Sequence, residues 1–185
     1  MPSIQIYNSN KALPLAIEHQ IRAYVRILWH DAYTYDLNAP LVPDERHPQY
    51  VVLGEQHALF SAARVNWVTV SYVGQSLKMY CIGDVFTYPA FRKQGYANQV
   101  VDAATRLIRS DASTDAAILF TDPALENLYG QSGWQHVSEL QASIGLEDSP
   151  EAYPAFAMML FLSEKGLAAK ANFARHPIFL PGYGW

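Results

Sequence analysis

Apolar and polar residues alternate along the chain with two different periods, and the first period is helical. Between residues 12 and 30 the apolar residues that would share one helix face are Ile17, Ile21, Tyr24, Val25 and Leu28. Pro14 suits the first turn of this helix. The next segment, DAYTYDLNAPLVPDERHPQY, contains three prolines and many polar residues. We predict a long loop there with at most a short helix, a kind of segment that often forms a lid or a binding surface.

From residue 50 the pattern becomes that of β-strands. Segments 50–55, 58–73 and 77–88 are rich in β-branched and aromatic residues, which predicts an antiparallel meander. Further along we expect a helix over about 95–109, a buried strand over 116–121, a short helix to about 131 that Asp122 caps, and strands near 134–144 and 156–162. This order predicts a mixed α/β (α+β) fold in which helices cover one central sheet.

Length and composition predict a single folded domain over residues 1–185. The chain is 50% hydrophobic and 16% charged, which excludes a disordered protein. The 13 Lys and Arg residues against 17 Asp and Glu give a formal net charge of −4 without a basic block, so we expect no nucleic acid partner. No apolar run approaches the roughly 20 residues of a membrane span, so we expect no membrane partner. A homodimer is compatible with this composition.

Cysteine and histidine usage narrows the possible chemistry. Cys81 is the single cysteine, which excludes an intramolecular disulfide and fits a reducing compartment. The 6 histidines show no metal-ligand spacing, so we expect no metal. The first residues, MPSIQIYNSN, lack the charged and apolar regions of a signal peptide. We therefore expect a cytoplasmic protein.

The segment GDVFTYPAFRKQGYANQVVDAA is the most informative part of the sequence. A predicted strand runs into a loop with Arg92, Lys93 and Gly95, and an amphipathic helix begins immediately afterwards. The first amides of a helix have no intrahelical partners, and with the helix dipole they can cradle a pyrophosphate. The glycine pattern is neither that of a P-loop nor that of a Rossmann fingerprint. An ordinary strand–turn–helix with a surface Arg-Lys pair is the alternative interpretation.

These residues resemble the GNAT superfamily of acetyl-CoA-dependent N-acetyltransferases. The family motif Q/R-x-x-G-x-G/A matches Arg92-Lys93-Gln94-Gly95-Tyr96-Ala97, with Pro89 three residues before it. The "LYxxxGF" phrase of the family matches residues 128–134, with Trp134 in place of Phe. The order of motifs and elements agrees from about residue 50 to 145. The resemblance implies a mostly antiparallel mixed sheet of about six to seven strands, flanked by helices and splayed at the cofactor site.

The resemblance also implies how acetyl-CoA would bind. Pantetheine would run between the strand that ends near Tyr88 and the strand 116–121, paired with the backbone of Val85, Phe86 and Thr87. Asn127 would be a further cofactor contact. The residues that would hold the pyrophosphate are Arg92, Lys93, Gln94, Gly95, Tyr96, Ala97 and Asn98.

GNAT enzymes usually let a free amine attack the thioester directly, which requires a base for the ammonium proton and an acid for the leaving thiolate. Tyr129 matches the family tyrosine that protonates the thiolate, and packing under the sheet is its alternative role. Asp84, just before the splay, is the candidate base, with a hydrogen-bonding surface carboxylate as the alternative. Glu55 and His57 are weaker candidates. Cys81 lies inside a strand pattern without a paired histidine, which disfavours covalent catalysis.

The amine acceptor is less closely defined by the sequence. The loop after the first helix contains Tyr33, Tyr35 and Asp36, followed by Asp44 and Glu45, and aromatic faces with carboxylates suit a cationic amine. A solvated polar loop is the alternative interpretation of these residues.

A second, weaker resemblance bears on the acceptor. The long hairpin, the Ser132-Gly133-Trp134 phrase and the terminal Trp185 are similar to aminoglycoside 2′-N-acetyltransferases, in which the terminal Trp carboxylate helps to hold the polyamino sugar. Gly83 stands where that family's catalytic glutamate would fall, and no acidic residue directly precedes Trp185. We expect acetyl transfer to a primary amine of a small molecule, with aminoglycosides and polyamine-like compounds as candidates. A peptide N-terminus, a lysine side chain, and a non-catalytic acetyl-CoA-binding domain are the alternatives.

Overall fold

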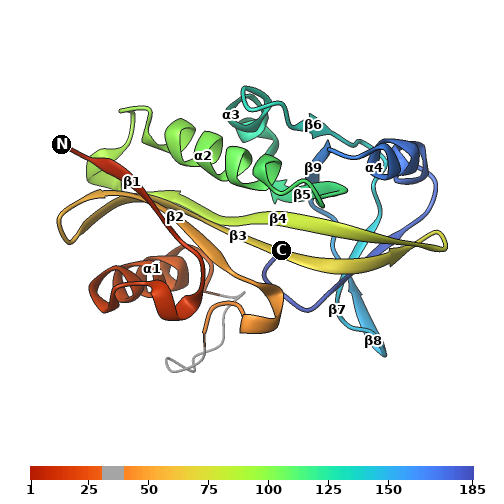
Figure 1. Ribbon diagram of the computed structural model, residues 1–185, viewed down its shortest axis with the longest axis horizontal. Coiled ribbons are helices and arrows are strands. Elements are labelled where there is room, and N and C mark those ends of the chain that lie inside the picture. The colour runs from red at the N-terminus through yellow and green to blue at the C-terminus, as the bar shows by residue number, and fades with distance from the viewer. Residues whose placement is uncertain (31–39) are drawn as a thin grey trace.

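The computed structural model describes residues 1–30 and 40–185, and two sheets organise this part of the chain (Figure 1). The strands of the seven-stranded sheet, in spatial order, are β1 (Ser3–Tyr7), β2 (Gln49–Glu55), β3 (Ala58–Tyr72), β4 (Gln75–Thr87), β5 (Ala116–Thr121), β9 (Phe156–Phe161) and β6 (Gln135–His136). The strands of the three-stranded sheet are β10 (Ile178–Pro181), β7 (Ala142–Leu146) and β8 (Ser149–Ala152). The α-helices are α1 (Leu15–Leu28), α2 (Tyr96–Ser110), α3 (Glu126–Gly130) and α4 (Glu164–Ala169). The 3-10 helices are η1 (Asn10–Ala12), η2 (Asp44–Arg46), η3 (Pro89–Phe91), η4 (Pro123–Leu125) and η5 (Lys170–Asn172).

Helices α1 and α2 cover opposite faces of the large sheet (Figure 1). Side chains alternate between the two faces of a strand, and the apolar residues follow this rule. Val52 and Ala62 pack in the cluster that includes α1, whereas Val51 and Val65 pack in the cluster that includes α2. The far ends of β3 and β4 pack instead with the second sheet and α4 in a third apolar cluster. The predicted mixed, mostly antiparallel sheet flanked by helices is confirmed.

Most of the predicted elements are present with small changes at their ends. The helices expected over 12–30 and 95–109 are α1 and α2, and the strand expected over 116–121 is β5. The single strand expected near 134–144 is wrong, because Leu140 N–H donates to the Val137 carbonyl (3.3 Å) in a turn that separates β6 from β7. β1, β8, β10 and α4 were not predicted. No helix in the described part of the chain is long and apolar enough to cross a membrane.

The large sheet splays between β4 and β5. These strands pair in parallel over three positions only, Met79–Cys81 with Ala116–Ile118. Beyond Cys81, β4 continues along β3 to Thr87, while β5 continues along β9 to Thr121. The two strands therefore enclose a wedge whose facing edges have no partner strand in the described residues, as predicted for the cofactor site.

Strand β4 carries a β-bulge at the wedge. Ala62 pairs with Phe86 and Arg64 pairs with Gly83, so Asp84 and Val85 together oppose one residue of β3. Asp84 has a left-handed backbone with φ +52°. A bulge bends its strand and redirects the side chains next to it. The bulge thus sets the direction of the Asp84 carboxylate.

Candidate active site

The loop from β4 into α2 forms a cradle of backbone amides. Lys93 and Gly95 both adopt left-handed φ angles, +64° and +75°, which turn the chain sharply into the helix. Within the described chain, the N–H groups of residues 93–98 donate no backbone hydrogen bond, and the residues around them are largely exposed. The helix dipole adds positive potential at this end. Orphan amides that point to solvent at a helix N-terminus fit a pyrophosphate.

Two predicted cofactor contacts at this loop are held by other groups. The Arg92 side chain turns back, donating from Nε to the Thr87 carbonyl (3.1 Å) and from Nη2 to the Tyr24 hydroxyl (3.3 Å). The Asn98 side chain donates to the Gln131 amide oxygen (2.6 Å), which ties α2 to α3. Lys93, Gln94 and Asn127 are exposed. The cradle therefore consists of backbone, and Lys93 is the cation placed beside it.

The other predicted cofactor contacts lie along the wedge. Val85 packs against the α2 side of the sheet, and Phe86 is buried on the α1 side. The Thr87 hydroxyl lies 2.9 Å from that of Ser61 and marks the end of β4. Tyr96 and Ala97 are half-buried in the first turn of α2. Residues 85–87 thus line the β4 edge that faces the wedge.

Tyr129 lies on the β5 side of the wedge. It belongs to α3, is 5% exposed, and shares a side-chain hydrogen bond with Thr121 at the end of β5. Burial raises the pKa of Tyr129 above the ordinary value of 10.0, and the hydrogen bond with Thr121 offsets part of this rise. The phenol is therefore protonated at neutral pH and can donate a proton at the open end of the wedge. This geometry suits the predicted acid.

Asp84 lies on the β4 side, at the face of the sheet that α1 covers. Its Oδ2 atom accepts from Arg64 Nε at 2.6 Å, and the two side chains are 7% and 1% exposed. The Arg64 guanidinium also donates from Nη2 to the Gly184 carbonyl (2.7 Å) and from Nη1 to the Asn66 amide oxygen. We call this group, Arg64, Asn66, Asp84 and the Gly184 carbonyl, the Arg64 cluster. Its members apart from Asp84 were not predicted, because they meet only in the folded sheet.

The weaker base candidates lie elsewhere. Glu55 ends β2 and accepts from the N-terminal amino group at 2.6 Å, and His57 is exposed in the turn between β2 and β3. Neither contacts the bulge. Cys81 is fully buried at the last β4–β5 pair, and burial raises the pKa of its thiol to about 11. A protonated, buried thiol is a poor nucleophile.

The C-terminal residues and η2 meet over the Arg64 cluster. Trp185 is 7% exposed, its indole Nε1 donates to the Pro181 carbonyl (3.1 Å), and the Arg46 guanidinium lies 4.3 Å from the centre of its ring. Arg46 also donates to the Tyr183 carbonyl. Asp44 and Glu45 are exposed in η2. The predicted substrate residues Tyr33, Tyr35 and Asp36 lie outside the described residues.

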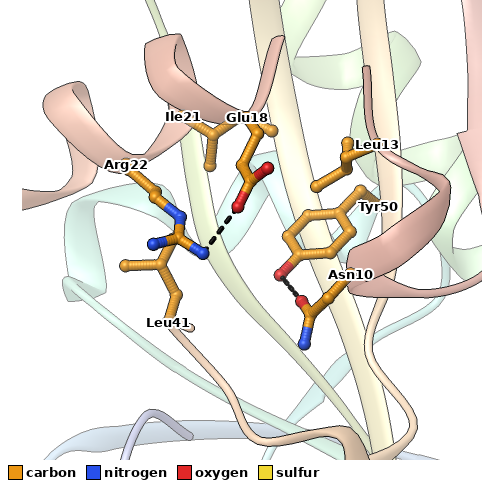
Figure 2. Close-up of a pocket in the computed structure, with 7 residues that line it drawn as sticks. All are labelled: Asn10, Leu13, Glu18, Ile21, Arg22, Leu41 and Tyr50. Carbon is orange, nitrogen blue, oxygen red and sulfur yellow. Dashed lines mark hydrogen bonds and ion pairs between the residues drawn. The ribbon is translucent and has the colours of Figure 1, made fainter. Parts of the chain in front are cut away.

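A pocket opens beside the Arg64 cluster, between α1, η1 and β2 (Figure 2). It encloses about 210 Å³, part of it open to solvent. Tyr50 forms its floor, donating to the Asn10 amide oxygen (2.6 Å), and Glu18 pairs with Arg22 at 2.5 Å on its α1 side. Tyr50 is also the cross-strand partner of Arg64. Burial raises the pKa of Tyr50 to about 12, while Arg64 acts to lower it.

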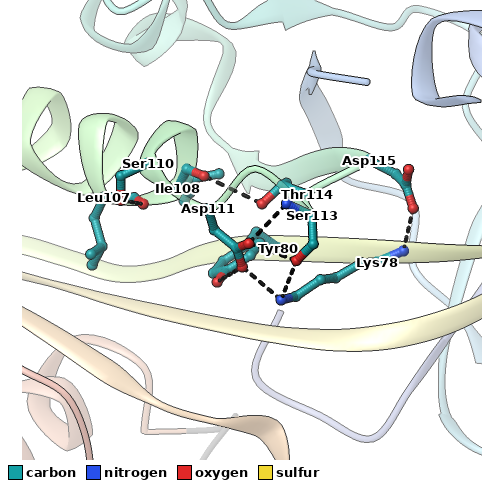
Figure 3. Close-up of polar contacts among 9 residues, drawn as sticks. All are labelled: Lys78, Tyr80, Leu107, Ile108, Ser110, Asp111, Ser113, Thr114 and Asp115. Atoms are coloured by element: carbon teal, nitrogen blue, oxygen red, sulfur yellow. Dashed lines mark hydrogen bonds and ion pairs between the residues drawn. The ribbon is translucent and has the colours of Figure 1, made fainter. Parts of the chain in front are cut away.

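A second polar network lies at the closed end of the wedge (Figure 3). Asp111 accepts from Lys78 Nζ (2.6 Å) and from the Tyr80 hydroxyl (2.8 Å), and Asp115 accepts from the Lys78 backbone N–H (2.8 Å). The hydrogen bond from Lys78 lowers the pKa of Asp111 well below its ordinary value. These bonds join β4 to the start of β5. They hold the strands together at one end while the other end is open.

No cluster of three or more His, Cys, Asp or Glu side chains that could hold a metal is found in residues 1–30 and 40–185. The candidate site is made up of the backbone amides of residues 93–98, the wedge between β4 and β5, the buried phenol of Tyr129 and the buried carboxylate of Asp84.

Comparison with known proteins identifies this arrangement. The family model described as acetyltransferase (GNAT) domain matches residues 14–137, and the chain belongs to this family. As a GNAT acetyltransferase, the protein is an N-acetyltransferase that uses acetyl-CoA as its acetyl donor. No curated protein matches the sequence.

Solved structures share the fold at low sequence identity. ElaA of Escherichia coli has 17% identity and a TM-score of 0.60, over 86% of this chain and 99% of that one. An acyl-CoA N-acyltransferase from Pseudomonas aeruginosa has 19% identity and a TM-score of 0.59, over 86% and 99%. The CoA-dependent acyl-homoserine lactone synthase BjaI, solved with SAM and isopentyl-CoA, has 13% identity and a TM-score of 0.62, over 100% and 95%. The similarity to BjaI extends over the C-terminal part as well.

Proposed function

We propose that the protein transfers the acetyl group of acetyl-CoA directly to a primary amine of a small molecule, without an acyl-enzyme. Asp84 and Tyr129 lie on the two sides of the wedge, where a base and an acid are needed. The buried Cys81 thiol, with its raised pKa, favours direct attack over an acyl-cysteine.

The residues of the wedge divide the chemistry between them. Acetyl-CoA supplies a thioester carbonyl that an amine can attack. Asp84 takes the proton from the substrate ammonium, directly or through water, since only the free amine is a nucleophile. The new C–N bond forms as the C–S bond breaks, and Tyr129 gives its proton to the leaving sulfur. The backbone amides of residues 93–98 bind the pyrophosphate and fix the register of the cofactor along β4.

The cover over the Arg64 cluster is the observation that favours a small acceptor. Arg46 of η2 contacts both the Tyr183 carbonyl and the Trp185 ring, so two segments close over the sheet face beside Asp84. A peptide acceptor needs an open groove, whereas such a cover suits a small molecule. Among small amines, polyamines and aminoglycosides are the first to test, because the terminal Trp185 and the Ser132-Gly133-Trp134 phrase are the features on which we base the comparison with aminoglycoside 2′-N-acetyltransferases.

A thiol-release assay tests this proposal. The protein with acetyl-CoA is offered monoamines, polyamines, aminoglycosides, free amino acids and peptides with a free N-terminus or lysine, and free coenzyme A is measured. We expect the highest kcat/KM for a small amine. Turnover confined to peptides would contradict the small-molecule acceptor. Acetyl-CoA binding without turnover on the whole panel would indicate a binding domain instead.

A further inference from the structure

Arg64 connects three separate parts of the molecule through one buried guanidinium. Nε contacts the Asp84 carboxylate on β4, Nη1 contacts the Asn66 amide oxygen on β3, the strand of Arg64 itself, and Nη2 contacts the Gly184 carbonyl 120 residues away. The side chain is 1% exposed. Planar guanidinium groups offer several donors in fixed directions, which a lysine ammonium cannot reproduce.

The strand opposite Arg64 is shaped to receive this guanidinium. Gly83 is the cross-strand partner of Arg64, and a Cβ at position 83 would lie 2.3 Å from Arg64 Nη2. The glycine therefore leaves the room that the guanidinium occupies. The next residue is Asp84, whose bulge conformation turns its carboxylate toward Nε.

Burying an ion pair is costly, so the pair must be explained. Desolvation of two buried charges offsets most of their attraction, and apolar residues of similar volume often stabilise a fold as well or better. Stability alone therefore does not account for an arginine that is 1% exposed at the acceptor side of the bulge. A role in orienting the Asp84 carboxylate and the C-terminal segment at Gly184 does explain why this arginine is buried here.

We propose that Arg64 is a positioning residue that holds both the Asp84 carboxylate and the Gly184 carbonyl, so that one side chain orients the base and the wall of the acceptor site. This inference rests on the proposed function, since it requires Asp84 to act on the substrate amine. The guanidinium itself transfers no proton. Its Nε donor holds the Asp84 carboxylate in one orientation, and its Nη2 donor keeps residues 182–185 against the sheet.

Other charged and titratable groups face this cluster and are part of its electrostatics. Tyr50 approaches from β2 and Cys81 from β4. The charge of Arg64 lowers the pKa of both groups, and the charge of Asp84 raises it. Arg46 of η2 also lowers the pKa of Cys81. On α1, Arg22 lowers the pKa of Tyr50 and Glu18 raises it. Arg64 is the group among these that contacts the Asp84 carboxylate at 2.6 Å, so its removal changes the environment of Asp84 most.

Substitution of Arg64 separates a positioning role from a structural one. In Arg64→Met we expect kcat to fall about 100-fold, as for misplaced catalytic groups. The dissociation constant of acetyl-CoA should not change, because the printed contacts of Arg64 are with Asp84, Asn66 and Gly184 and not with the loop into α2. Arg64→Lys keeps the charge, but an ammonium cannot contact both Asp84 and Gly184 in the directions of the guanidinium, so this variant should not restore kcat. Arg106→Met, which removes an exposed arginine of α2, is the matched control.

Gly83→Ala tests the same proposal without changing any charge. The three atoms nearest to the added Cβ all belong to the Arg64 guanidinium, so we expect the variant to fold with this guanidinium displaced. We expect lower kcat and faster hydrogen–deuterium exchange in the peptide that spans residues 182–185. Gly130→Ala, where an added Cβ meets nothing within 4 Å, should change neither.

The outcomes distinguish the two proposals. If Arg64→Met and Gly83→Ala lower only the melting temperature, leaving kcat and the exchange of residues 182–185 as in the wild type, Arg64 is structural and the inference is overturned. If the wild type releases no thiol with any amine, the proposed function fails. The exchange measurement needs no substrate and still decides whether Arg64 holds the C-terminal residues.

Discussion

Asp84 combines backbone strain with a buried charge. A non-glycine residue in the left-handed region costs about 1 kcal/mol or more, and such strain gathers at functional sites. Here the strain accompanies a bulge that turns the carboxylate toward Arg64 at 2.6 Å. The strained backbone at Asp84 therefore destabilises the fold locally but fixes the direction of its carboxylate.

The first prediction concerns the Asp84 carboxylate. Asparagine tolerates the left-handed backbone, so Asp84→Asn should keep the bulge while removing the charge. We expect kcat to fall about 100-fold or more, as for loss of a general base. The deficit should be largest at low pH, where little free amine exists in solution. Full pH–rate profiles of both proteins check this, and parallel profiles would remove Asp84 as the base.

The second prediction concerns the Tyr129 hydroxyl. Tyr129→Phe keeps the buried ring and removes the proton donor, so kcat should fall about 100-fold while acetyl-CoA affinity is kept. Because burial raises the pKa of Tyr129 above 10.0, the wild-type phenol stays protonated past that pH. An unchanged kcat in the variant would exclude Tyr129 as the acid.

Among the elements, α2 shows how a helix end becomes a binding site. Its first turn has no side-chain cap, since the N-cap is Gly95 with φ +75°. The amides stay available, and the left-handed residues 93 and 95 direct them to solvent. We therefore propose that this helix end is left uncapped for the pyrophosphate.

The third prediction tests the cradle with matched glycines. Gly95→Ala places a Cβ on a left-handed residue, which costs about 1 to 2 kcal/mol. Gly74 has nearly the same φ (+73°) in the β3–β4 turn and equal open space, so Gly74→Ala should cost as much stability. We expect weaker acetyl-CoA binding by isothermal titration calorimetry in Gly95→Ala alone. Equal affinities in the two variants would contradict the cradle.

The fourth prediction concerns the network at the closed end of the wedge (Figure 3). The hydrogen bond from Lys78 lowers the pKa of Asp111 in the folded protein. The ionised carboxylate therefore adds to the free energy of unfolding at pH values above the unfolded-state pKa. This contribution is lost as the pH falls through the folded-state pKa. Asp111→Asn should reduce the free energy of unfolding at pH 7 by about 1 to 2 kcal/mol. The difference should shrink below about pH 4. Urea denaturation at several pH values measures it, and a constant difference would contradict the assignment.

Local patterns account for what the sequence could predict. The helix periodicity of α1 and α2, the β2–β4 meander and the loop before α2 depend on neighbouring residues, and all were predicted. The separation of β6 from β7 and the parallel pairing of β10 with β7 depend on contacts between distant segments. The same holds within the site. Tyr129 was predicted from a family motif and Asp84 from its position just before the splay, whereas the Arg64–Gly184 contact joins residues 120 apart.

At the scale of the whole molecule, the C-terminal residues complete the face opposite to α2. Trp185 packs in the apolar cluster that joins the two sheets, and its ring lies under Arg46. The end of the chain therefore contributes both to the core and to the wall beside Asp84.

The fifth prediction concerns this wall. Trp185→Ala removes a buried ring, which costs about 3 to 5 kcal/mol. It also releases Arg46, so KM for the amine should rise, while the dissociation constant of acetyl-CoA should not change if the cofactor binds at α2 as proposed. Steady-state kinetics with each substrate varied separately checks this. A rise in both constants would indicate general loosening of the fold rather than loss of the wall.

Gly83 and Arg64 also restrict how this enzyme can change by mutation. Because the guanidinium fills the space above Gly83, a larger residue at 83 displaces it from Asp84 and Gly184 unless residue 64 has first become smaller. The two positions should therefore show strong epistasis, with the order of substitutions deciding whether an intermediate folds with an intact site. A carboxylate could move one residue along β4, from 84 to 83, only by that route. Directed evolution toward new amines should accordingly find substitutions at position 64 before any at position 83.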